Sequence, residues 1–168
     1  MPLTNFPDGL ESATGFYGPL YGAGQGATPI AATDATLTVT RAAHAGRTVV
    51  LSRAAGIAVT LPNATGTGAV YRFVIGTAIT SNATTVKVAR AADTIQGRAY
   101  VETDTSNAVI AFAAVAGTDD TVTFNGGTLG GLEGDEIVVT DIAANRFQVM
   151  VFSKASSTEA TPFSNTVS

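Results

Sequence analysis

The stretch from residue 30 to residue 153 is a succession of short runs rich in β-branched and aromatic residues, separated by turn residues. Such runs are typical of strands, and their spacing of about 8 to 15 residues is typical of a sandwich or barrel. Several runs alternate apolar with polar residues, as at Ile57, Val59 and Leu61, which indicates one packed and one exposed face. The nine predicted strands cover residues 37–40, 48–51, 57–61, 70–75, 85–89, 109–114, 121–124, 136–140 and 147–152.

Turn chemistry between the runs supports the same fold. Asn125-Gly126-Gly127 and Ala144-Asn145 offer residues that accept positive φ or begin tight turns. No stretch has the periodicity of an amphipathic helix, and Thr and Val are frequent where helix formers would be expected. We therefore predict an all-β fold, a compact antiparallel β-sandwich or β-barrel, with its domain over residues 30–153.

Two segments of different composition flank this predicted domain. Residues 1–29 are rich in Gly and Pro and carry Phe6, Pro7, Phe16, Tyr17 and Tyr21. Free linkers contain few aromatic residues, because exposed rings gain nothing from burial there. We therefore predict an extended N-terminal arm that lies on another surface. Residues 154–168 are rich in Ser and Thr, and we predict a short flexible C-terminal tail there.

Charge and cysteine content exclude several classes of function. Only 13% of the residues are charged, about half the usual share. The net charge of −4 leaves no basic surface for a polyanion or an anionic membrane, so we expect neither nucleic acid nor membrane as a partner. The absence of cysteine excludes a disulfide framework and a thiolate nucleophile.

Residues capable of catalysis are scarce. His44 is the only histidine, and its small neighbours indicate an exposed turn rather than a pocket. Asp119 and Asp120 are adjacent at the start of a predicted strand, so their side chains point to opposite faces, and we expect a solvated turn. We predict no catalytic site and no enzyme activity.

Two glycine-rich segments resemble ligand-binding loops only loosely. The segment Gly22–Ala27 fits the dinucleotide pattern in spacing, but Pro-rich and aromatic sequence surrounds it in place of a strand and a helix. The segment Gly130–Glu136 is acidic, but it fits neither calcium-loop register, and we interpret it as a hairpin turn. We therefore predict no cofactor and no metal.

Several short motifs together resemble the head decoration (cement) proteins of tailed bacteriophages. They are Asn5–Gly9, Leu51–Pro62, Tyr71–Ile75, Gly130–Gly134 and Ala160–Phe163. The resemblance implies a non-enzymatic virion protein on the outer surface of the capsid, commonly a homotrimer, that locks neighbouring major capsid subunits together. In that setting Phe6, Pro7, Phe16, Tyr17 and Tyr21 are the expected capsid-binding residues of the arm, because aromatic anchors bury large areas.

A carbohydrate-binding or fibre-associated β module is the alternative. It would use exposed aromatic residues such as Tyr71, Tyr100 or Phe147 as platforms for sugar rings. These residues lie within predicted strands, so we expect them to pack in the core instead.

Overall fold

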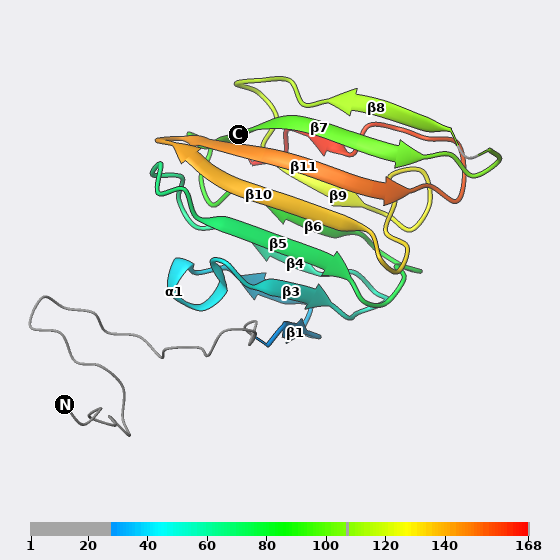
Figure 1. Ribbon diagram of the computed structural model, residues 1–168, viewed down its shortest axis with the longest axis horizontal. Helices are drawn as coiled ribbons and strands as arrows, with labels where there is room; N and C mark the ends of the chain where they lie inside the picture. The colour runs from blue at the N-terminus through cyan, green and yellow to red at the C-terminus, as the bar shows by residue number, and fades with distance from the viewer. Residues whose placement is uncertain (1–27, 107, 168) are drawn as a thin grey trace, which may run out of the picture.

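The computed structural model describes residues 28–106 and 108–167, which form two β-sheets packed face to face (Figure 1). The larger sheet has the order β1-β3-β5-β10-β11-β7-β8. Its strands are β1 (Ile30–Ala32), β3 (Thr48–Leu51), β5 (Val70–Ile75), β7 (Thr94–Glu102), β8 (Val109–Ala113), β10 (Glu136–Ala143) and β11 (Arg146–Lys154). The all-β prediction is therefore confirmed, and the architecture is a sandwich.

The smaller sheet lies behind the larger one and has the order β12-β9-β6-β4-β2. Its strands are β2 (Thr36–Thr38), β4 (Ala58–Thr60), β6 (Thr84–Lys87), β9 (Thr121–Phe124) and β12 (Phe163–Ser164). One short helix, α1 (Arg41–His44), begins after Thr40, whose hydroxyl accepts a hydrogen bond from the amide of Ala43. Within the described residues, no helix is long and apolar enough to cross a bilayer.

Strand direction differs from the antiparallel prediction, because both sheets are mixed. From β1 to β6 the chain alternates between the two sheets, so each strand runs parallel to the one that precedes it in its own sheet. Strands β7 and β11 are also parallel. Alternation of apolar and polar residues is the same in both directions, which is why the sequence pattern did not distinguish them.

The core lies between the sheets and is built from the alternate residues of each strand. In β11 every second side chain is buried and the others are exposed. The largest fully buried side chains include Tyr71, Phe73, Phe124 and Phe147. Burying these rings removes the most apolar area per residue from water and holds the sheets together.

Three strands were not predicted, and β7 is the longest of them. Gly97 stands in the middle of β7 with φ +152°, and a Cβ built there would lie 1.7 Å from the carbonyl oxygen of Val149 in β11. A glycine inside a strand normally weakens it. Here the glycine permits a close approach between two backbones.

The C-terminal segment differs from the predicted flexible tail. Phe163 and Ser164 form β12, which pairs with β9, and Phe163 is 6% exposed. The carboxylate of Asp120 accepts hydrogen bonds from the amides of Thr166 and Val167, both at 2.9 Å. Strand pairing, an aromatic anchor and a buried carboxylate thus attach this segment to the domain.

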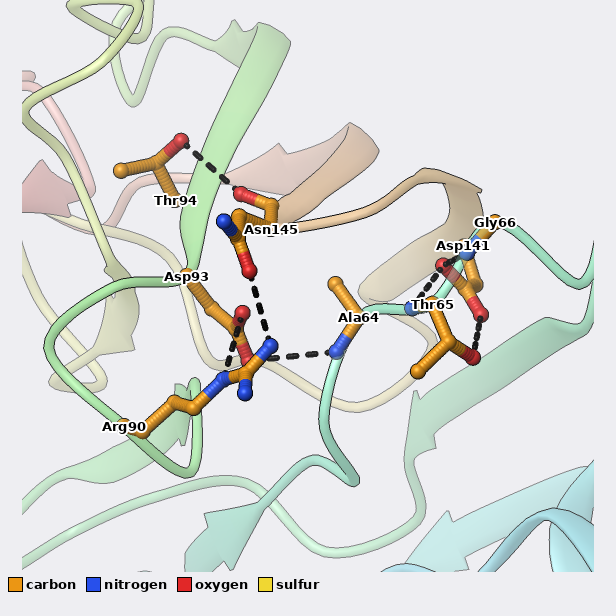
Figure 2. Close-up of polar contacts among 8 residues, drawn as sticks. All are labelled: Ala64, Thr65, Gly66, Arg90, Asp93, Thr94, Asp141 and Asn145. Atoms are coloured by element: carbon orange, nitrogen blue, oxygen red, sulfur yellow. Dashed lines mark hydrogen bonds and ion pairs between the residues drawn. The ribbon is translucent and has the colours of Figure 1, made fainter.

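Two buried aspartates hold the loops at one end of the sandwich (Figure 2). Asp93 accepts hydrogen bonds from Arg90 Nε at 3.0 Å and the Ala64 amide at 3.1 Å. Asp141 accepts hydrogen bonds from the amides of Thr65, Gly66 and Thr67 and from both threonine hydroxyls. Burial raises the pKa of Asp141, but these hydrogen bonds outweigh it and hold the pKa below its ordinary value of 3.8.

Candidate interaction surface

The predicted arm residues Phe6, Pro7, Phe16, Tyr17 and Tyr21 lie outside the described part of the chain. The glycine-rich segment Gly22–Ala27 lies outside it as well. The site described below is therefore built from the β domain alone.

His44 and the aspartate pair have structural roles in the domain. His44 is the last residue of helix α1 rather than part of an exposed turn; it is 9% exposed, and its Nδ1 lies 3.0 Å from the amide nitrogen of Thr40. Asp119 and Asp120 are also buried rather than solvated. Asp119 accepts a hydrogen bond from the amide of Val115, whereas Asp120 binds the C-terminal segment. The two carboxylates point inward because they accept hydrogen bonds from backbone amides, those of Val115 and Thr166, that would otherwise lack a partner.

The segment Gly130–Glu136 is a turn organised by its own aspartate. Asp135 accepts hydrogen bonds from the amides of Gly131, Leu132 and Lys154 at 2.7–3.1 Å. Burial raises the pKa of Asp135 above 3.8 and prevails over the lowering effect of these three bonds. In the described residues, no three His, Cys, Asp or Glu side chains gather as a metal site would require.

The outer face of the larger sheet carries exposed apolar side chains. Across neighbouring strands, Glu136, Phe152, Tyr100 and Ala111 form one row, and Val138, Met150, Arg98 and Ala113 form the next. Phe152 is 46% exposed and Met150 39% exposed. Large apolar side chains that stay exposed on a regular sheet are typical of an interaction site.

Shallow hollows mark this face. One hollow, of about 320 Å³, is lined by Tyr100, Val109 and Phe152 together with the ends of the neighbouring strands. The rings of Tyr100 and Phe152 stack with centroids 5.7 Å apart and an interplanar angle of 16°. A second hollow of about 280 Å³ lies over Gly97, where no side chain fills the surface. The face is thus uneven and offers depressions to a partner's side chains.

The charges on this face are few and mostly paired. Arg72 forms a two-bond ion pair with Glu136, and Lys154 Nζ lies 2.7 Å from Glu102 Oε1. Arg98 is exposed, and the structure gives it no ion-pair partner among the described residues. Removing a paired charge from water costs less free energy than removing a single charge. A partner can therefore exclude water from most of this face.

This face was not predicted from the sequence, because alternation of apolar and polar residues indicates which side chains enter the core and not which outer face binds a partner. Met150 and Phe152 occupy positions of β11 that alternate with buried Phe147, Val149 and Val151, and these apolar residues on the exposed side are the sequence signal for this face. Of the proposed sugar platforms, Tyr71 and Phe147 are buried in the core as expected, and Tyr100 is half-buried on the outer face.

Comparison with known proteins adds no relative. No family model, no curated protein and no solved structure matches the chain.

Proposed function

We propose that this protein is a structural component of a phage virion that binds the outer surface of the capsid and stabilises contacts between major capsid subunits. The observation that carries the proposal is the outer face of the larger sheet, where Met150 and Phe152 are exposed beside shallow hollows. A broad, weakly charged face suits attachment to another protein surface. The sequence resemblance to head decoration proteins supports the same role.

The N-terminal arm is the second element of the proposal. Phe6, Pro7, Phe16, Tyr17 and Tyr21 would supply anchors in pockets of the capsid, since a few buried aromatic residues carry most of the binding energy in many interfaces. The arm reaches the domain at β1, an edge strand of the larger sheet. We propose a homotrimer as the form that occupies the capsid.

Binding to capsids that lack the protein tests this proposal. We expect saturable, stoichiometric binding, weakened about tenfold or more by Phe152→Ser or by deletion of residues 1–27, since tenfold corresponds to about 1.4 kcal/mol. Val115→Ser is the matched control, because Val115 is 59% exposed in the turn after β8 and should leave binding unchanged. Absence of saturable binding, or binding that neither change affects, would refute the proposal.

One observation favours the carbohydrate-binding alternative. The stacked Tyr100 and Phe152 rings line the hollow of about 320 Å³ beside the ion pair of Glu102 and Lys154, and aromatic faces next to polar groups suit sugar rings. Retention on a glycan array that is lost in Phe152→Ser, without capsid binding, would support this alternative over the capsid role.

A further inference from the structure

Strand β8 is the edge of the larger sheet that the described residues form, and it has no charged residue and no proline. Its sequence is Val109-Ile110-Ala111-Phe112-Ala113, and among the described residues it pairs on one side only, with β7. Natural sheets usually protect such edges with Lys, Pro, bulges or very short strands. The other sheet edges fit this rule, because β1 and β2 have three residues each and β12 has two.

The register with β7 shows which backbone groups face outward. The amide of Thr103 donates to the carbonyl of Ala108, and the amide of Ala114 donates to that of Gly97. Bonded and non-bonded positions alternate along an antiparallel pair, so Ile110 and Phe112 bond to β7. The N–H and C=O groups of Val109, Ala111 and Ala113 therefore point away from the sheet and can receive another strand.

We propose that β8 pairs with β8 of a second copy of this chain, antiparallel and with the two-fold axis at Ala111. In this register Val109 faces Ala113 of the partner copy, and Ala111 faces its own equivalent. All three outward positions of each strand then lie in bonded pairs, which gives about six new backbone hydrogen bonds. A shift by one residue would lose this match.

Side chains on both faces of β8 suit this pairing. On the outer face the facing residues are Ala and Val, whose small side chains let the strands approach. On the inner face Ile110 is 40% exposed beside half-buried Phe112, and each would meet the other residue of the partner copy. Apolar cross-strand pairs of this kind stabilise a sheet by about 0.2–1 kcal/mol each.

Charge is also complementary across the pair. Glu102 lies beside Val109 on the outer face, and Arg98 lies beside Ala113. Because Val109 faces Ala113 of the other copy, each row that crosses the junction has Glu102 at one end and Arg98 at the other. No like charges are brought together along these rows, so charge does not oppose this register.

The pairing would be weak and does not depend on the proposed function. One strand pair buries less than about 1,200 Å², which is typical of transient interfaces, so we expect association in the micromolar range. It leaves the outer face and the β1 edge free, so β8 pairs could also link trimers to one another on a shell.

Cysteine cross-linking tests the register, since the chain has no cysteine of its own. Directly opposed residues of a bonded pair have Cα atoms about 5.5 Å apart, which a disulfide can span. We expect Ala111→Cys to form disulfide dimers at least about tenfold faster than Met150→Cys, because pairing raises the effective concentration of the thiols at position 111. Met150→Cys is the control, since Met150 is exposed on the outer face but lies away from the β8 edge. Equal rates for the two variants would overturn the proposal.

A charge swap at the two-fold axis provides the second test. Ala111→Lys and Ala111→Glu would each place like charges opposite each other, whereas an equimolar mixture would place Lys against Glu. We expect sedimentation velocity at increasing concentration to show pairs for the wild type and for the mixture, and about tenfold weaker association for either variant alone. A wild type that stays unpaired, or a mixture that does not recover, would overturn the proposal; circular dichroism confirms that each variant is folded.

Discussion

Asp141 is expected to be the most consequential single polar residue for stability in this domain. It is 2% exposed and accepts five hydrogen bonds from residues 65–67, three of them from backbone amides. Asp141→Ala would leave these amides without their acceptor. Because residues 65–67 are themselves exposed, water can replace part of each bond, and a loss of about 1 kcal/mol per amide is appropriate. The expected total is about 3 kcal/mol, or about 10 °C in melting temperature.

Urea unfolding at pH 7 measures this loss, with Asp34→Ala as the matched control. Asp34 is an exposed aspartate, so its removal should change the free energy of unfolding by less than about 0.5 kcal/mol. Thr67→Val removes one hydroxyl donor to Asp141 and should cost about 1 kcal/mol. A loss below about 1 kcal/mol for Asp141→Ala would refute the assigned role.

The pH dependence of the same difference gives an independent check. The pKa of Asp141 is lower in the folded protein than its ordinary value of 3.8, so its stabilising contribution is present above that value. It is lost as pH falls through the lower, folded pKa. The stability difference between the wild type and Asp141→Ala should therefore be constant near neutral pH and shrink below about pH 3.8. A difference that does not change with pH would show that the carboxylate charge is not involved.

Three further predictions concern other parts of the domain. Gly97→Ala should lower the free energy of unfolding by about 3 kcal/mol or more, because its Cβ would collide with the Val149 carbonyl. The control Gly46→Ala has φ +71° but open space around its Cβ, so it should cost about 1 kcal/mol. Thermal unfolding measures both. Deletion of residues 162–168 should lower the melting temperature by about 5 °C or more, because it removes β12 and two amides that donate to the buried Asp120 carboxylate. An unchanged melting temperature would support a free tail. The raised pKa of Asp135 means that its charged form is disfavoured in the folded protein. Relative to Asp135→Ala, the wild type should therefore gain stability as pH falls through the folded pKa of Asp135. Chemical denaturation at a series of pH values measures this difference.

Much of the strand layout follows from the sequence alone. Each of the nine predicted strands overlaps an observed one, because alternation of apolar and polar residues directly reflects which side chains a sandwich buries. Arm residues Phe6, Phe16, Tyr17 and Tyr21 remain predictions, since they lie outside the described residues.

Strand partners, strand direction and the surface that remains open were decided only by the tertiary structure. Period-two alternation is identical in parallel and antiparallel strands. The local sequence therefore does not show that strands β1 to β6 alternate between the two sheets. The close approach of the β11 backbone to Gly97 is visible only in the folded sheet, and Asp120, predicted to be solvated, is buried because amides of the distant C-terminal segment donate to it. Strand β8 resembles the other strands in sequence, and only its position at the end of the sheet leaves its outward amides without a strand partner among the described residues. These features depend on contacts between residues far apart in the chain, which local sequence patterns do not encode.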